Sequence, residues 1–233
     1  ASVGLLDADI YGPSQQLMLG IPSDQRPEQQ GGEYLLPVEA HGLKTMSMGY
    51  LTTAETPMVW RGPMASSALS QLLEKTLWGD IDLLLVDMPP GTGDIQLTLS
   101  QRATLSGAVI VTTPQDIALL DARKGIEMFQ KVDVPVLGLI ENMSSHTCPA
   151  CGHSEPLFGE AGGENLAAHY AVPLLAQIPL SRAIREQSDQ GRPIVVSEPE
   201  GQEAQIYQQA ATALMDSLAQ QKPASGPVIS MSD

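Results

Sequence analysis

Three aspartates follow apolar runs of the sequence, at points where a strand would end. Asp7 and Asp9 come after "SVGLL", and Asp87 ends "IDLLLVD", the most apolar run of the chain. A carboxylate at the end of a buried strand can hold a water molecule bound to Mg²⁺, because Mg²⁺ keeps most of its hydration and takes few protein ligands. We therefore predict Asp87 as a metal-binding residue and Asp7 as part of the same cofactor-binding site.

The loop after Asp87 has the composition of a phosphate-binding turn. It reads "MPPGTGD", in which Gly91 and Gly93 leave backbone N–H groups accessible to a terminal phosphate. Asp94 suits the N-cap of a following helix. Asp, Gly and Pro are equally common in strand-to-helix turns of no special function, so either loop taken singly is compatible with that interpretation. Two such strand ends on one predicted sheet edge favour a nucleotide.

Cys148 and Cys151 form a second candidate site, in "SSHTCPACGH". The proline fixes the bend and the glycine can take positive φ, so both sulfurs should point to one side. Thiolates suit zinc or an iron–sulfur cluster. Two cysteines cannot complete a four-thiolate site, but a symmetric dimer can. An intrachain zinc site with His146 and His153, a redox dithiol and inert cysteines remain as alternatives.

The elements that would position these residues alternate along the chain. We expect strands at 2–7, 43–50, 81–87, 107–113, 134–142 and 173–179. We expect helices at 62–78, 94–104, 116–131, 161–170, 181–189 and 202–221. Most of these strands are apolar on both faces, which is typical of strands covered on both sides. Strand–helix alternation predicts a doubly wound α/β fold with a mainly parallel sheet, with ligands bound at the carboxyl edge.

Composition narrows the possible partners. The formal net charge of −15 disfavours nucleic acid and an anionic membrane surface as partners. No apolar run approaches the roughly 18–20 residues that span a bilayer, and no signal-peptide pattern occurs. The chain has only two cysteines, spaced C-x-x-C, so a cytoplasmic protein with a metal or redox site fits better than a secreted disulfide framework.

The two ends of the chain carry further expectations. The sequence begins inside an apolar strand, without an initiator methionine, and contains no Gly-Lys dipeptide of a phosphate-binding loop. We therefore expect the strand and phosphate loop to precede Ala1, and the chain as given to be inactive in hydrolysis. Residues 1–222 are predicted to form one domain and residues 223–233 a disordered tail. The helix at 202–221 carries an apolar stripe that should pack on the sheet.

Several motifs occur in the order seen in one protein family. They are "LLDADIYGPS", "VWRGPM", "LLVDMPPGTGD", "ENMS", "CPACG" and "AQIPL". The chain thereby resembles the Mrp family of ApbC-type P-loop ATPases, which carry iron–sulfur clusters and are related to MinD and the nitrogenase iron protein. The resemblance extends to about residue 220. The sequence given departs from the family pattern in one respect, because it contains no Walker A loop.

The resemblance implies roles for individual residues. Asp87 is similar to the Walker B aspartate and Asp9 to the switch I aspartate that helps position metal and attacking water, which makes both catalytic candidates. Residues 91–94 resemble switch II. Asn142 and Pro179 resemble the contacts on the adenine side of the nucleotide. The cysteine pair resembles the family's cluster ligands, so that a cluster would bridge two subunits.

These observations predict an ATP-dependent carrier of iron–sulfur clusters. We expect ATP, Mg²⁺ and a cluster, most simply 4Fe–4S, in a cytoplasmic homodimer. Scaffold proteins would donate the cluster and apoproteins would receive it, without nucleic acid or membrane as partners. A MinD/ParA-like positioning ATPase would need a basic or membrane-binding surface, and a zinc-stabilised binding module would ignore ATP. A metabolic enzyme of the same fold would need an acid and a base in a substrate pocket, which the sequence does not indicate.

Overall fold

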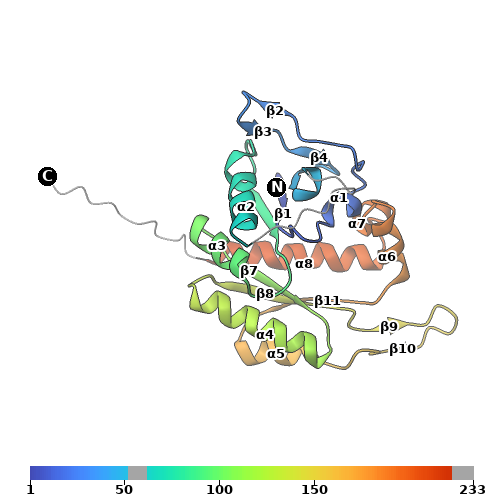
Figure 1. Cartoon of the computed structure of the whole chain (residues 1–233). Helices are drawn as coiled ribbons and strands as arrows, with labels where there is room; N and C mark the ends of the chain where they lie inside the picture. Colours follow the sequence, from blue (N-terminus) through green and yellow to red (C-terminus); the bar gives the residue numbers. More distant parts are fainter. Residues whose placement is uncertain (52–61, 222–233) are drawn as a thin grey trace. The chain divides into compact units, whose positions relative to one another are not determined.

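The computed structural model describes residues 1–51 and 62–221 (Figure 1). By internal contacts the chain forms two compact units. The first comprises Ala1–Ala103 with Ser181–Gln205, and the second Thr104–Leu180 with the chain from Ile206 onward. Part of the motif "VWRGPM" and all of the predicted tail at 223–233 lie outside the described residues. The single domain expected over 1–222 stays a prediction.

The first unit is built on a four-stranded, mainly parallel sheet. Its order is β4 (Val38–Ala40), β5 (Leu43–Ser47), β1 (Val3–Asp7) and β6 (Leu83–Asp87). The central strand β1 runs parallel to β5 and to β6, whereas β4 is antiparallel to β5. Asp7, the last residue of β1, is the register partner of Ser47 on one side and of Asp87 on the other. Both partner strands therefore end beside the end of β1.

Helices and short strands complete this unit. They are α1 (Gln15–Met18), β2 (Gln29–Gln30), β3 (Tyr34–Leu35), a 3₁₀ turn (Met48–Tyr50), α2 (Gly62–Lys75), α3 (Asp94–Arg102), α6 (Arg182–Asp189) and α7 (Ile194–Ser197). Helix α2 packs against α3, and its Leu69 and Leu72 are almost fully buried. These two leucines are part of the buried core of this unit.

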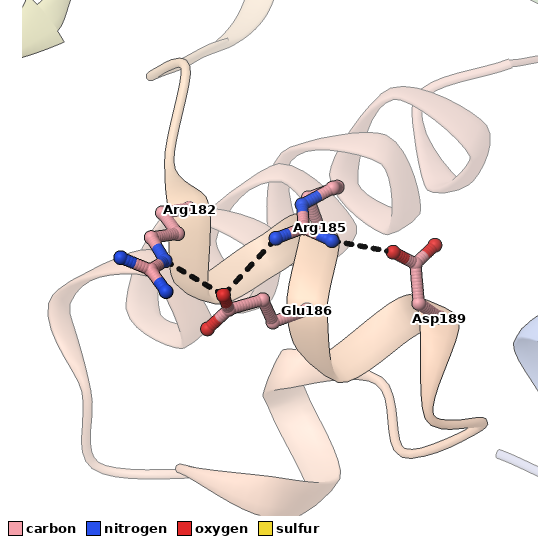
Figure 2. Close-up of polar contacts among 4 residues, drawn as sticks. All are labelled: Arg182, Arg185, Glu186 and Asp189. Carbon is pink, nitrogen blue, oxygen red and sulfur yellow. Dashed lines mark hydrogen bonds and ion pairs between the residues drawn. The ribbon is translucent and has the colours of Figure 1, made fainter.

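Helix α6 carries a chain of ion pairs on its surface (Figure 2). Glu186 accepts from Arg182 Nε at 2.6 Å and from Arg185 Nη2 at 3.0 Å, and Arg185 Nη1 donates to Asp189 at 2.8 Å. Two of these pairs, Arg182–Glu186 and Arg185–Asp189, join residues four positions apart, which lie one turn apart along the helix. They support a short helix whose sequence has little apolar surface of its own.

The second unit contains a three-stranded parallel sheet, with the order β11 (Leu174–Ile178), β8 (Val136–Asn142) and β7 (Ala108–Thr112). Helices α4 (Asp116–Lys131) and α5 (Gly162–Tyr170) pack on the sheet and on each other. The core between them consists of Ile110, Ala122, Ile126, Leu139, Leu166 and Ala167. A small hairpin, β9 (His146–Thr147) and β10 (Ser154–Glu155), follows β8.

Helix α8 (Gln202–Ala219) ends the described chain. Its predicted apolar stripe is buried or half-buried, with Ala210 6% exposed, whereas Met215 beside the stripe is 44% exposed. The stripe thus marks the packed side of the helix. In residues 1–51 and 62–221, no helix combines the length and the hydropathy that a membrane crossing requires.

All six predicted strands and all six predicted helices are present, but two details of the prediction are wrong. The segment 43–50 is a strand only to Ser47 and then becomes a 3₁₀ turn. Strand β6, expected to be buried on both faces, is the edge strand of its sheet, and Leu85 is 41% exposed. Within the described residues β6 pairs with β1 alone.

Candidate nucleotide and metal-binding sites

The two predicted carboxylate loops begin side by side at one edge of the first sheet. Asp7 and Asp87 are register partners at the ends of β1 and β6. The N–H of Ala8 donates to the Asp87 carbonyl oxygen at 2.8 Å, so the pairing continues one residue beyond β1. This arrangement confirms the expectation that the ends of two parallel strands bring these aspartates to the same place.

Asp7 is fully buried and accepts four hydrogen bonds. Its Oδ1 accepts from the N–H of Asp9 at 3.2 Å. Its Oδ2 accepts from the N–H groups of Ser14 and Gln15, both at 3.1 Å, and from Ser47 Oγ at 3.0 Å. Burial raises the pKa of Asp7 above its ordinary value, and the bonds from the Gln15 backbone and from Ser47 offset part of that rise.

Asp9 lies in the loop that Asp7 closes. Its Oδ1 accepts from the N–H of Tyr11 at 3.1 Å and of Gly12 at 3.0 Å. Such side-chain-to-backbone bonds are typical of Asx turns, and they explain why "DADIYG" folds back on itself rather than continuing the strand. The Asp9 side chain is half-buried. Its position is therefore set by the loop backbone.

Asp87 differs from Asp7 in having a side-chain amide as its partner. Its Oδ2 accepts from Gln15 Nε2 at 2.6 Å. Burial raises the pKa of Asp87 above the ordinary value, the Gln15 bond lowers it in part, and the nearby charge of Asp9 adds to the rise. A partly buried carboxylate whose charge is poorly compensated suits Mg²⁺, which binds oxygen ligands and retains water. The chemistry of this one carboxylate therefore suits a water molecule bound to Mg²⁺, the role that the sequence predicts for Asp87.

The loop from 88 to 93 leads from β6 into α3. Gly91 has a φ of +94°, a conformation that favours glycine. The helix N-cap is Gly93, and Asp94 is the first helical residue, so the prediction of Asp94 as N-cap is wrong. Because glycine has no side chain that could accept a hydrogen bond, the first N–H groups of the helix stay available to a ligand. That position fits a phosphate, as the sequence predicts for Gly91 and Gly93.

Gln96 holds this loop in place, and sequence reasoning missed it. The side chain is 4% exposed, and its Nε2 donates to the carbonyl oxygens of Pro89 and Gly91, each at 2.9 Å. A buried amide bonded to two loop carbonyls restricts how the loop can move. The sequence offered one indication: a glutamine at the third position of α3, amid apolar neighbours.

Asn142 and Pro179 lie next to each other in the second unit. Asn142 ends β8 and is the register partner of Ile178, which ends β11 and immediately precedes Pro179. The N–H of Ser144 donates to the Ile178 carbonyl oxygen at 2.9 Å, and Asn142 Oδ1 accepts from Met143 N–H at 2.9 Å. The two predicted adenine contacts therefore share one strand edge. Their role in binding stays a prediction.

The cysteine pair occupies the turn of the β9–β10 hairpin. Cys148 N–H donates to the His153 carbonyl oxygen at 2.8 Å, and Gly152 N–H donates to the Cys148 carbonyl oxygen at 2.9 Å. Gly152 has a φ of +73°, which confirms the predicted use of this glycine. The pKa of the Cys148 thiol is lowered, first by the backbone N–H groups of Cys151 and Ala150 and then by a hydrogen bond with the Cys151 thiol.

The hairpin therefore places both cysteines in one turn and favours the thiolate of Cys148. Cys148 is half-buried and Cys151 exposed, and both are free thiols. Within the described part of the chain, no three His, Cys, Asp or Glu side chains form a group that could hold a metal ion. His146 Nδ1 lies 3.3 Å from the Leu180 carbonyl oxygen. These facts give no support to the alternative of an intrachain zinc site with histidines.

The class of the protein follows from this fold and these loops. A nucleotide-binding protein from Archaeoglobus fulgidus, solved in complex with ADP, matches with a TM-score of 0.71 and 36% identity over 85% of this chain and 76% of that one. MinD from Pyrococcus horikoshii matches with a TM-score of 0.65 and 22% identity over 94% and 85%, which concerns the fold alone. The chain has the P-loop NTPase fold of MinD and ParA type.

The family can be stated more narrowly. The family model of ParA type described as NUBPL iron-transfer P-loop NTPase matches residues 1–215, and the chain belongs to this family. It is 59% identical over 91% of its length to the iron–sulfur cluster carrier proteins of Pseudomonas fragi and Escherichia coli. It spans 74% of the former and only 57% of the latter. The resemblance to the Mrp carriers is confirmed.

Proposed function

We propose that the full-length protein carries an iron–sulfur cluster on Cys148 and Cys151 and delivers it to apoproteins in an ATP-dependent manner. The observation that carries this proposal is the placement of two free thiols, one half-buried and one exposed, in one tight turn between β9 and β10. Thiolates are soft ligands that suit iron. The names of the Pseudomonas fragi and Escherichia coli relatives support the same function.

The cluster is proposed to bridge two copies of the chain. A 4Fe–4S cluster takes four thiolates, and each chain offers the two of Cys148 and Cys151. A twofold axis through the cluster supplies the other two from an identical turn. The lowered pKa of the Cys148 thiol favours this, because the thiolate is the form that binds metal.

The proposed nucleotide site uses the edge where β1 and β6 end. Bound Mg²⁺ would neutralise phosphate charge there. Asp87 would hold a metal-bound water, and Asp9 would orient the attacking water. The N–H groups of Gly91 and Gly93 would face the terminal phosphate. The register pairing of β1 with β6, which fixes where both loops start, supports these roles.

The adenine side of the nucleotide is proposed to contact Asn142 and Pro179. Their adjacency at the ends of β8 and β11 supports a common binding surface. Asp7 is proposed to belong to the phosphate side of the site, through its place at the end of β1. We place the carrier in the cytoplasm, with scaffold proteins as cluster donors and apo iron–sulfur proteins as recipients.

Anaerobic reconstitution with iron and sulfide tests the carrier function. Wild type should load about four irons per dimer and become dimeric by light scattering. Cys148→Ser and Cys151→Ser should each abolish a stable cluster, because the hydroxyl is a harder and poorer ligand for iron. The loaded wild type should then activate an apoprotein of the 4Fe–4S class, and ATP should change the rate of that transfer.

His153→Ala is the matched control within the same turn. Its backbone carbonyl, which accepts from Cys148 N–H, is retained, so the turn should persist and iron loading should be unchanged. A metal-loaded monomer would reject the bridging arrangement. Loss of metal in His146→Ala or His153→Ala would favour an intrachain zinc site instead.

A further inference from the structure

We infer that Asp7 is a positioning residue for ATP hydrolysis, which fixes the loop at residues 8–15 and thereby the carboxylate of Asp9. The inference rests on the proposed nucleotide site and deepens it. It assigns Asp7 an indirect part, as the buried anchor of the loop, together with Ser47 at the end of β5. Neither side chain needs to touch the nucleotide for this role.

The hydrogen bonds of Asp7 fill its capacity. A carboxylate offers about four acceptor positions, and Asp7 accepts from the N–H groups of Asp9, Ser14 and Gln15 and from Ser47 Oγ. Both Asp7 and Ser47 are 0% exposed. A carboxylate without solvent access and with its acceptor positions occupied is suited to hold backbone, not to coordinate a ligand directly.

The bonds join the two ends of one loop. Oδ1 binds the loop at Asp9, its second residue, and Oδ2 binds it at Ser14 and Gln15, where α1 begins. One side chain thus closes the segment into a ring. Ser47 Oγ, which also accepts from Gly49 N–H at 3.0 Å, ties that ring to β5.

The ring determines where the Asp9 carboxylate lies. Asp9 is held through its own N–H by Asp7, and its Oδ1 is held by the N–H groups of Tyr11 and Gly12 inside the same ring. If the anchor is lost, these donors and the Asp9 side chain move together. A displacement of about 1 Å of a catalytic group can cost about 100-fold in rate.

Asp7→Asn is the sharpest test, because it has the same shape. The asparagine oxygen can still accept from the three donors that bind Oδ2 of Asp7. Its NH₂ group then takes the place of Oδ1 and faces the N–H of Asp9, so the hydrogen bond that is lost is the one to Asp9. In the full-length protein, kcat for ATP hydrolysis should fall at least about 10-fold. KM for ATP should change less than about twofold, since binding contacts are retained.

A double-mutant cycle asks whether Asp7 acts through Asp9. In the Asp9→Ala background, Asp7→Asn should cause no further loss of kcat. Ser47→Ala is the second variant should Asp7→Asn fold poorly, and it should lower kcat in the same direction by a smaller factor. Losses that multiply in the double variant would overturn the inference.

Asp82→Asn is the matched control. Asp82 is exposed, lies just before β6 at its opposite end, and accepts from Ser2 N–H at 2.6 Å, so the same substitution removes a carboxylate charge far from Asp9 while the asparagine oxygen can still accept that one bond. Its hydrolysis should equal wild type. A loss equal to that of Asp7→Asn would show a general effect on the sheet and overturn the inference.

Native-state hydrogen exchange separates this inference from the proposed function. The amide of Asp9 should exchange faster in Asp7→Asn, while the amides of Leu83–Asp87 in β6 stay as protected as in wild type. Unchanged exchange at Asp9 overturns the anchoring role even if hydrolysis falls. If exchange changes as expected but Asp9→Ala hydrolyses ATP at the wild-type rate, the proposed role of Asp9 is wrong, and the catalytic part of the inference falls with it.

Discussion

Replacing Asp87 by asparagine should separate the function of this residue from its effect on stability. The asparagine has the same shape, and its oxygen can still accept from Gln15 Nε2, which donates to Asp87 at 2.6 Å. Its neutral oxygen binds a metal-bound water more weakly than a carboxylate does. A residue that binds a metal-bound water, and not the metal itself, typically contributes about 10–100-fold to activity or metal affinity. Mg²⁺-dependent hydrolysis should therefore fall by that factor in Asp87→Asn.

The same substitution should stabilise the metal-free protein near neutral pH. Burial raises the pKa of Asp87 in the folded state. As pH rises above the unfolded value of about 3.9, the unfolded chain releases this proton before the folded chain does, so wild type loses stability until the folded pKa is passed. Asparagine does not titrate. The stability advantage of Asp87→Asn should therefore grow from about pH 4 upward and be largest at neutral pH.

Urea unfolding between pH 4 and 7 in the presence of EDTA measures this advantage, and phosphate release with Mg²⁺-ATP measures activity. The exposed Asp82→Asn variant serves again as a control and should show neither effect. An Asp87→Asn variant that hydrolyses ATP at the wild-type rate would remove Asp87 from the metal site. A variant less stable than wild type at pH 7 would refute the assignment of a buried, poorly compensated carboxylate.

Two further predictions concern the second unit. A Cβ on Gly138 would lie 2.5 Å from Leu175 Cγ, so Gly138→Ala should lower the free energy of unfolding by about 1–3 kcal/mol. Gly125 lies in the middle of α4, and a Cβ there would have its nearest contact at 3.4 Å, so Gly125→Ala should raise the free energy of unfolding by about 0.5–1 kcal/mol. Urea unfolding measures both variants, and a Gly138→Ala protein more stable than the Gly125→Ala protein would contradict both predictions. In Cys151→Ser, Cys148 should react with iodoacetamide with a midpoint below the ordinary thiol pKa, because the backbone N–H groups that stabilise its thiolate are retained; a midpoint at or above about 8.5 would contradict this.

The strand ends that carry Asp7 and Asp87 could be predicted from the sequence because they depend on local pattern. Each follows an apolar run of strand length, and the carboxyl ends of parallel strands meet at one edge whatever the details of packing. The hairpin turn around Cys148 could likewise be predicted, since proline and glycine fix its backbone locally. Gly152 takes the expected positive φ.

The residues that hold the loops could not be predicted. Ser47, Gln15 and Gln96 act through contacts whose partners are distant or lie in irregular backbone, and their residue types are common in any sequence. Ser47, for example, reaches Asp7 across 40 positions of sequence. Asp7 and Ser47 come together only because β1 pairs with β5 in a register that makes these two residues partners. A serine at the end of a strand gives no indication of which neighbour it will face.

The different hydrogen-bond partners of Asp7 and Asp87 indicate that the two carboxylates have different roles at this edge of the sheet. Burial raises the pKa of both carboxylates by more than their hydrogen bonds lower it, so ionisation of either carboxyl group reduces stability. Asp7 is compensated by three backbone N–H groups and a hydroxyl, all of which belong to the fold itself. Among the described residues, the side-chain hydrogen bond to Asp87 is the one that Oδ2 accepts from Gln15 Nε2, so further acceptor positions of this carboxylate remain for a ligand. An anchor should be saturated by the protein, and a ligand-binding group should retain capacity for its ligand, so the pattern of hydrogen bonds favours Asp7 as the anchor and Asp87 as the residue that meets the metal.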